Sequence, residues 1–330
     1  MYKSYYGLKR NPFEITPDPS FLFPTRRHNE ALAALYYGVR RHKGFVVMTG
    51  EVGTGKTLLV RCLLELLNRR SMAYAYVFNS RLSASEFLHY VVGDFGLPTA
   101  GKSKSDLLLE LSNFLISRHQ KRLTTVLVVD EAHHLSTDVL EEIRLMTNLE
   151  TAQEKLLQIL LVGQPELDEK LDSVELRQLK QRIALRSQLE PLNLDETGGY
   201  IRRRLELAGA NSHAPVLFPP ETINRVYRHS RGIPRLINTV CENALITAFA
   251  RQVPCVAADI IDEVAADFRL SVMHQRGEML QQEEEPPAMQ DNPEVWQAVK
   301  TLMQLHDYLQ NSRSNEPEPA LQGEPRSRRI

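Results

Sequence analysis

The eight-residue pattern GEVGTGKT lies between a short apolar run and a segment with helical composition. The apolar run, Phe45–Thr49, predicts a buried strand, and a helix is expected at Lys56–Asn68. Glycines in such a turn let backbone N–H groups point toward phosphate oxygens, and the amino end of the helix adds partial positive charge. The pattern GxxxxGK[ST] in this setting therefore predicts a loop that binds the phosphates of a nucleotide.

Two side chains of this loop have expected roles of their own. Lys56 is expected to reach the β- and γ-phosphates, and the Thr57 hydroxyl is placed to ligate Mg²⁺. The expected ligands are therefore ATP and Mg²⁺. The candidate nucleotide-binding residues are Gly50, Glu51, Val52, Gly53, Thr54, Gly55, Lys56, Thr57 and Leu58.

A second motif, VLVVDEAHHL, contains an apolar strand that ends in two acids. The end of this strand delivers Asp130 toward the metal, and Glu131 is the candidate general base for an attacking water. The tetrapeptide DEAH also occurs in helicases, but no second nucleotide-binding domain and no helicase-like arginine motifs follow. The adjacent His133 and His134 are interpreted as a solvated helix start and not as a metal pair.

Elements alternate between strand and helix up to Pro191, which predicts a parallel α/β sheet. Only helical patterns follow, and the last sixty residues include acidic, proline-containing segments typical of disorder. The predicted organisation is 1–44 (N-terminal arm and helix), 45–191 (nucleotide-binding α/β domain), 192–270 (small all-helical domain) and 271–330 (mostly disordered tail with one amphipathic helix at about 293–310).

The tail helix has apolar residues at spacings of three and four, and Trp296 lies beside that face. Two interpretations stay open: the helix folds back onto the body of the protein, or it docks a partner or a second subunit.

Composition excludes several classes of protein. The formal net charge is −1, which does not favour a nucleic-acid or anionic-membrane partner for the whole chain. The three cysteines, Cys62, Cys241 and Cys255, are far apart, so neither a disulfide framework nor a zinc site is expected. No apolar run is long enough to span a membrane. A cytoplasmic protein, with the option of peripheral association with the inner membrane, is expected.

These motifs resemble the AAA+ family, and within it the ExeA-like (general secretion pathway A) ATPases. The resemblance covers about residues 1–270. It implies a five-stranded parallel sheet of order 5-1-4-3-2, with helices on both faces, followed by a helical lid. The matching stretches are YYGLKRNPFEITPDPSFLF, the phosphate loop, VLVVDEAHHL, LQILLVGQPEL, LRQLKQRIALR and SRGIPRLIN.

The resemblance also implies roles for single residues. Gln164 matches a polar sensor of the γ-phosphate or the attacking water, and Arg235 matches the lid arginine that touches the γ-phosphate. Arg182 matches an arginine finger donated to a neighbouring subunit, with Arg177 and Arg186 as rivals. A finger donated in trans implies a homo-oligomer, expected as a ring.

The aromatic arm at the start of the chain has two interpretations. Tyr5, Phe13 and Ile15 could wall the adenine, or they could serve packing alone. The three successive arginines at 202–204 are interpreted as a solvated helix face.

The resemblance implies a Mg-dependent ATP hydrolase that energises or switches an envelope secretion or export system, with membrane-bound components of that system as partners. The best-known secretion members have a membrane span and a periplasmic peptidoglycan-binding domain after the ATPase, for which this sequence has no signal. Soluble relatives of polysaccharide-export and exosortase-type systems are an equally good match. The alternative is a DNA-associated ATPase of the transposition-helper or origin-recognition type, and nucleic acid is the less favoured partner. A non-hydrolysing scaffold is disfavoured by intact Lys56, Asp130 and Glu131.

Overall fold

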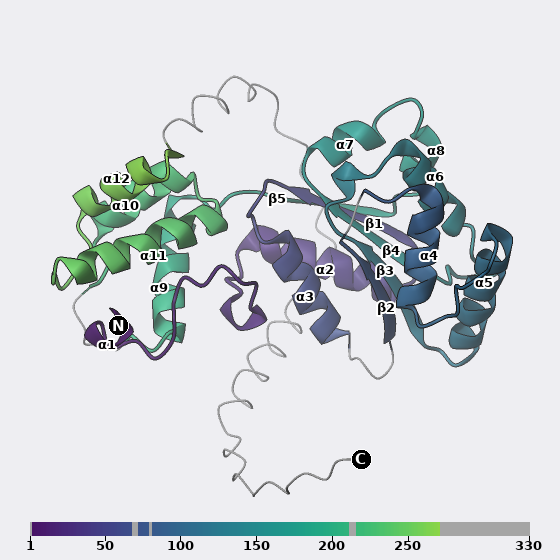
Figure 1. Ribbon diagram of the computed structural model, residues 1–330, viewed down its shortest axis with the longest axis horizontal. Helices are drawn as coiled ribbons and strands as arrows, with labels where there is room; N and C mark the ends of the chain where they lie inside the picture. Colours follow the sequence, from purple (N-terminus) through teal and green to yellow (C-terminus); the bar gives the residue numbers. More distant parts are fainter. Residues whose placement is uncertain (1, 68–71, 79–80, 211–215, 271–330) are drawn as a thin grey trace, which may run out of the picture. The chain divides into compact units, whose positions relative to one another are not determined.

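The structure, a computed structural model, describes residues 2–67, 72–78, 81–210 and 216–270 of the 330-residue chain. The tail helix predicted at about 293–310 lies outside these ranges. The described residues form a five-stranded parallel sheet with its flanking helices and a group of helices that follows it (Figure 1).

The sheet has the strand order β2-β3-β4-β1-β5, which read from the other edge is the predicted 5-1-4-3-2. Every residue of β1, β4 and nearly every residue of β3 is buried, because these three strands are central and both of their faces are covered. The strands are β1 Phe45–Gly50, β2 Met72–Val77, β3 Thr124–Val129, β4 Gln158–Gly163 and β5 Leu185–Leu189.

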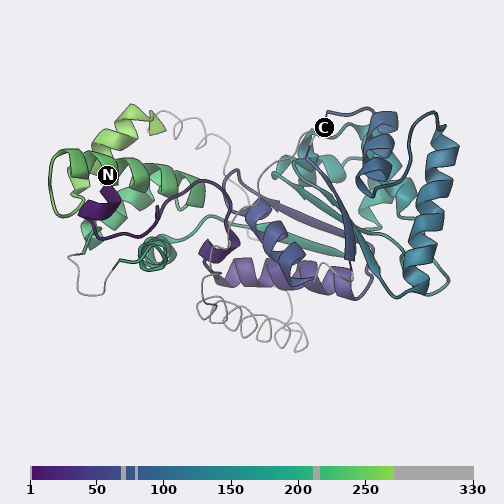
Figure 2. The ribbon, with the colours of Figure 1, turned by 60° about the horizontal axis from the view of Figure 1, so that its bottom comes forward.

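Alternate side chains of each strand enter two different cores, as the two-residue period of a strand requires. Phe45 and Val47 of β1 pack in the core under α4, α5 and α6, whereas Val46 and Met48 pack in the core under α2 and α3. Helices therefore cover both faces of the sheet, as predicted (Figure 1; Figure 2). The helices here are α2 Arg26–Arg40, α3 Lys56–Leu66, α4 Ala84–Asp94, α5 Lys104–Gln120, α6 Thr137–Met146, and the shorter α7 Glu166–Leu171 and α8 Arg177–Lys180.

Several helices begin at side-chain caps that the sequence encodes locally. Ser83 and Ser103 each accept a hydrogen bond from the backbone N–H three residues on, and the carboxylate at that position accepts one from the backbone N–H of the serine. Asn193 does the same at the first helix after the sheet. These capping boxes fix the residues at which the three helices begin.

The helices after the sheet share a core with the N-terminal arm. Phe13 is fully buried in it and contacts Phe218 edge to face, with ring centroids 5.7 Å apart. The packing interpretation therefore holds for Phe13. Tyr5 packs edge to face on Phe249, and Ile15 is exposed. The elements are α1 Tyr2–Tyr5, η1 Pro19–Phe21, α9 Leu194–Leu207, α10 Pro220–Ser230, α11 Pro234–Ala250 and α12 Ala258–Asp267.

One member of the arginine run at 202–204 is not solvated, and that part of the prediction was wrong. Arg204 is 5% exposed and donates hydrogen bonds to the carbonyls of Pro12 and Glu14. Its guanidinium also lies 4.7 Å from the centroid of the Phe21 ring. The helical period turns this arginine inward, toward the carbonyls of the arm, and away from the solvent-facing positions beside it.

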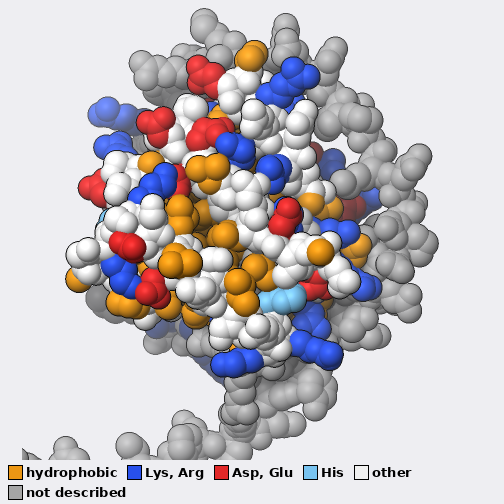
Figure 3. All heavy atoms as spheres, turned by 90° about the vertical axis from the view of Figure 1, so that its right-hand side faces the viewer, with side chains coloured by type: hydrophobic (Ala, Val, Ile, Leu, Met, Phe, Trp, Pro, Cys, Tyr) orange, Lys and Arg blue, Asp and Glu red, His pale blue; other side chains and the backbone are white. Residues whose placement is uncertain are grey.

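On the side of the sheet that bears α4, α5 and α6, hydrophobic side chains reach the surface and are surrounded by charged ones (Figure 3). Leu109 and Ile116 of α5 and Leu145 of α6 are exposed by 62%, 42% and 41%. In the part of the chain that the structure describes, no helix has the length and hydrophobicity needed to cross a membrane.

Candidate nucleotide site

The phosphate loop follows β1 directly and leads into α3, the arrangement that the sequence predicted. Gly53 has φ +84°, and a Cβ atom there would lie 2.6 Å from the Cβ atom of Arg235. Only glycine therefore suits this position, which lies against the first turn of α11. Thr54, fully buried, donates its hydroxyl to the carbonyl of Glu51 and so closes the loop on itself.

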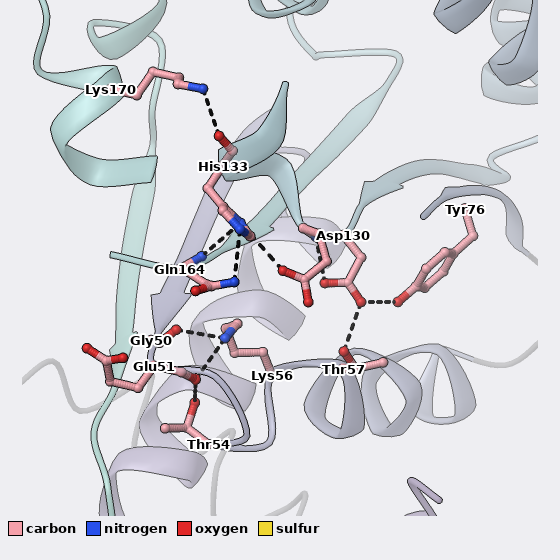
Figure 4. A network of polar contacts seen from close by, with 11 residues as sticks. Gly50, Glu51, Thr54, Lys56, Thr57, Tyr76, Asp130, His133, Gln164 and Lys170 are labelled. Atoms are coloured by element: carbon pink, nitrogen blue, oxygen red, sulfur yellow. Dashed lines mark hydrogen bonds and ion pairs between the residues drawn. The ribbon is translucent and has the colours of Figure 1, made fainter. Parts of the chain in front are cut away.

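Lys56 is 6% exposed and points back into the loop. Its ammonium donates hydrogen bonds to the carbonyls of Gly50 over 2.7 Å and Glu51 over 2.9 Å (Figure 4). Burial lowers the pKa of this ammonium, and the nearby carboxylates of Glu131 and Asp130 oppose the shift. The ammonium of Lys56 is buried, and its hydrogen-bond partners are neutral backbone carbonyls. It is therefore suited to bind the anionic oxygens of a phosphate.

Three donors surround the carboxylate of Asp130, which is 5% exposed at the end of β3. Its Oδ2 atom accepts the Thr57 hydroxyl over 2.9 Å and the Tyr76 hydroxyl over 2.8 Å, and its Oδ1 atom accepts the backbone N–H of Glu131. Burial raises the pKa of Tyr76, so the phenol remains a donor. Tyr76, on the edge strand β2, had no predicted role.

Glu131 combines an unusual backbone with a buried carboxylate oxygen that accepts no hydrogen bond in the described part of the chain. Its φ of +51° lies in the left-handed region, which costs a non-glycine residue about 1–3 kcal/mol. Its Oε2 atom is buried and has no hydrogen-bond partner among the described residues. Such an atom next to a phosphate loop is chemically suited to accept a proton from a water molecule.

The prediction that His133 belongs to a solvated helix start was wrong. Its side chain is 7% exposed, and its Nε2 atom accepts a hydrogen bond from the side-chain amide of Gln164 over 2.9 Å. Its Nδ1 atom lies 3.4 Å from Oε2 of Glu131 and 3.4 Å from the backbone nitrogen of Gln164. Burial and the neighbouring His134 lower the pKa of His133.

Gln164 follows β4, so it reaches the site from the strand next to the one that ends in Asp130 and Glu131. Figure 4 shows its side chain turned toward His133, above Lys56 in this view. The side-chain amide of Gln164, the expected sensor of water or phosphate, is therefore near Glu131, the candidate base. The imidazole of His133 lies between the amide and the carboxylate.

Two further elements contact the backbone of the phosphate loop. His28, in the first turn of α2, has its Nε2 atom 3.1 Å from the carbonyl of Thr54, and the Thr25 hydroxyl lies 2.7 Å from its Nδ1 atom. The backbone N–H of Arg235 donates to the carbonyl of Gly53 over 3.2 Å. Arg235 is thus in the first turn of α11 at the loop, where the sequence placed it, and its side chain is exposed.

Arg182 lies near the amino-terminal ends of the strands, opposite the end at which the phosphate loop lies. Ala184, two residues on, donates its backbone N–H to the carbonyl of Phe45, the first residue of β1, whereas the phosphate loop follows the last. The six residues of β1 separate the two ends of the strand by roughly 17–20 Å. Of the rivals, Arg186 is held in ion pairs by Asp168 and Asp172, and Arg177 is exposed.

The donor set fits ATP with Mg²⁺. Among the described residues, no cluster of three or more His, Cys, Asp and Glu side chains could hold a metal ion unaided. The paired oxygens of Thr57 and Asp130 supply a hydroxyl and a carboxylate, and Mg²⁺ is usually bound by one or two such groups together with phosphates of the substrate. The loop amides, Lys56 and the amino end of α3 provide the complementary phosphate site.

Comparison with known proteins agrees with this geometry. The family model described as "AAA domain" matches residues 39–171. General secretion pathway protein A of Aeromonas hydrophila is 44% identical over 252 residues, which cover 76% of this chain and 45% of the relative. The chain thus spans less than half the length of that curated relative.

Solved structures show the same fold. The Aeropyrum pernix ORC2 protein, in its ADPNP-ADP complexes, matches with a TM-score of 0.59 at 19% identity, over 78% of this chain and 71% of that chain. The ORC1 protein of the same organism, in complex with DNA, also matches with a TM-score of 0.59, at 16% identity over 94% and 84% of the two chains. At such identities the likeness concerns the fold alone.

The phosphate loop, the acidic end of β3 and the 5-1-4-3-2 sheet define an AAA+ P-loop ATPase. Within this class the chain belongs to the ExeA-like family, that of general secretion pathway protein A.

Proposed function

We propose that this chain hydrolyses ATP with Mg²⁺ and uses the energy to drive or switch an envelope secretion or export system. The observation that supports hydrolysis most strongly is the buried Oε2 atom of Glu131, which accepts no hydrogen bond from the described residues, at the end of the strand beside the phosphate loop. The pathway rests on the 44% identity with general secretion pathway protein A.

In this proposal the phosphate-binding and catalytic tasks are separate. The loop from Gly50 to Leu58 binds the nucleotide, and Lys56 turns from its carbonyl partners to the β- and γ-phosphates. Thr57 and Asp130 hold the metal ion, which neutralises charge on the phosphates when bound. Glu131 takes a proton from the attacking water as the water adds to the γ-phosphorus and ADP leaves with the bonding electron pair.

Three further residues complete the proposed site. Gln164 orients the water or contacts the γ-phosphate, and Arg235 contacts the same phosphate from the first turn of α11. Arg182 acts on the site of a neighbouring subunit, since it lies at the far edge of its own sheet. We propose that the active form is for this reason a homo-oligomer, and that the domain boundaries at 44, 191 and 270 separate arm, motor and lid.

The first experiment compares Lys56→Ala with Glu131→Gln. Lys56→Ala should abolish ATP binding, whereas Glu131→Gln should keep ATP affinity and lose turnover, because binding and proton transfer are separate jobs. Calorimetric ATP binding and phosphate release measure the two quantities. Glu169→Gln, which changes an exposed acid of α7, is the control. Normal turnover in Glu131→Gln would remove this residue as the base.

A second experiment concerns the pathway. We propose cytoplasmic chains that associate peripherally with membrane-bound export components. Co-purification from the native host with Glu131→Gln, in ATP and without it, should enrich export components only with ATP. Fluorescence anisotropy with duplex DNA at several salt concentrations tests the DNA-associated alternative. Tight, salt-sensitive DNA binding without export components would overturn the secretion assignment.

A further inference from the structure

One imidazole joins the ends of two neighbouring strands at the nucleotide site. His133 belongs to the 3-10 turn η2, Ala132–His134, after β3, and Gln164 directly follows β4. The amide of Gln164 donates to Nε2 of His133 over 2.9 Å. The Nδ1 atom of the same ring lies 3.4 Å from the backbone nitrogen of Gln164 and 3.4 Å from Oε2 of Glu131.

The position of the ring is fixed from outside the site. Lys170 of α7 donates hydrogen bonds to the carbonyl of His133 over 2.7 Å and to that of Leu135 over 2.8 Å. These bonds clamp the turn η2 against α7. The left-handed backbone of Glu131 lies at the start of the same turn. A strained backbone persists only where surrounding contacts over-determine it.

The side-chain amide of Gln164 can contact His133 and a bound water or phosphate at the same time. The side-chain nitrogen of Gln164 has two hydrogens, and His133 uses one of them. The other hydrogen and the amide oxygen stay available for a water molecule or a phosphate oxygen. A group bound at Gln164 is in this way connected to the carboxylate of Glu131 through a single ring.

We propose that His133 is a positioning residue that couples Gln164 to Glu131, so that the base is aligned only when the amide is engaged. The inference rests on the proposed ATP hydrolysis. In this role the imidazole acts through Gln164 and Glu131. It sets where Oε2 of Glu131 lies relative to the amide that orients the water.

The coupling predicts a specific kinetic signature. His133→Ala should lower kcat by roughly tenfold to a hundredfold, as expected for a misplaced catalytic group, with ATP affinity unchanged within about twofold. The effects of His133→Ala and Gln164→Ala on kcat should be strongly non-additive, because each breaks the same connection. His134→Ala is the matched control, since His134 is adjacent, exposed and within 3.9 Å of the same ring.

Two conservative variants separate a bridge from a single contact. His133→Asn keeps a polar group near the position of Nδ1, and His133→Gln keeps one near Nε2. A bridge requires both ends, so neither variant should restore full turnover. Recovery in either variant, additive effects in the double mutant, or an unchanged kcat in His133→Ala would each overturn the coupling.

The measurements also distinguish a failure of the His133 coupling from a failure of the proposed ATP hydrolysis. Calorimetric ATP binding and thermal unfolding are measured for every variant alongside turnover. A wild-type protein that binds ATP without hydrolysing it refutes the proposed activity itself. A wild-type protein that turns over ATP, with His133→Ala equally fast, refutes the coupling alone.

Discussion

The hydroxyl of Tyr76 donates a hydrogen bond over 2.8 Å to Oδ2 of Asp130, the same atom that accepts the Thr57 hydroxyl. The phenol comes from the edge strand β2 and the carboxylate from the end of β3, and in Figure 4 Tyr76 approaches Asp130 from the side opposite His133. The proposed metal-binding pair therefore has a third member that holds the carboxylate in place.

Tyr76→Phe should weaken magnesium-dependent nucleotide binding. A hydrogen bond to a charged group contributes about 1.5–3 kcal/mol, so the Mg²⁺ concentration needed for half-maximal ADP binding should rise roughly tenfold to a hundredfold. Calorimetry with ADP at graded Mg²⁺ concentrations measures the change without turnover. Tyr74→Phe, on the same strand with Tyr74 41% exposed, should have no effect. Equal magnesium dependence in both variants would contradict a positioning role for the phenol.

Arg182→Ala should reduce turnover by about 10³-fold or more with little loss of ATP affinity, as expected of a finger supplied in trans. Mixing this variant with Lys56→Ala should restore part of the activity, because one chain then supplies the finger and the other the loop. Arg177→Ala and Arg186→Ala are tested in parallel. The absence of rescue at every mixing ratio, with assembly intact by light scattering, would count against a shared site.

Gly232→Ala should destabilise the joint between β5 and the following helices. The residue has φ +73°, and an added Cβ would lie 1.7 Å from the carbonyl oxygen of Leu192. The backbone strain alone costs about 1–3 kcal/mol, and the clash requires the chain to move further. Gly96→Ala isolates the strain, since its φ is +79° with nothing within 4 Å of the Cβ. Denaturant unfolding should show the larger loss at Gly232; equal losses would disprove the clash.

The free energy of unfolding should decrease as the pH is lowered, and His28 should account for part of this decrease. Burial lowers its pKa from 6.5 in the folded state, and the hydrogen bond with the Thr54 carbonyl opposes part of that shift. Below about pH 6.5 the unfolded chain binds a proton that the folded chain resists, so stability present above pH 6.5 is lost as pH falls through the folded pKa. The slope of unfolding free energy between pH 7.5 and 5.5 should therefore be shallower in His28→Gln than in wild type or in His89→Gln. Parallel slopes in all three proteins would exclude His28 as the source.

The strands and the phosphate loop could be predicted because their signals are local, whereas the strand order was implied by the family resemblance. Val126 to Val129 is apolar and mostly β-branched, and the loop glycines occur at fixed offsets from Lys56. Capping boxes such as Ser83 with Glu86 mark helix starts within four residues of sequence. The confirmed fold class follows from such short patterns repeated along the chain.

The predictions failed where a side chain depends on distant partners. His133 was assigned to solvent because nothing near it in sequence reveals that Gln164, thirty-one residues later, follows the neighbouring strand. Tyr76 had no assignment because its reach to Asp130 depends on the pairing of β2 with β3. In sequence Arg204 resembled the two arginines before it, and its carbonyl partners lie some 190 residues earlier. Periodicity predicts which elements form, but the sheet register decides which side chains meet.

The burial of Phe13 among helices that follow residue 190 has a consequence for the order of synthesis. The arm is translated before these helices, and its apolar partners, including Phe218 and Leu245, follow about 200 residues later. At about 5–20 residues per second, the arm is without its native core for on the order of ten seconds or more. The sheet, made in the interval, can form while the arm still has no partner. During that time this aromatic stretch is a natural target for a chaperone that holds nascent chains.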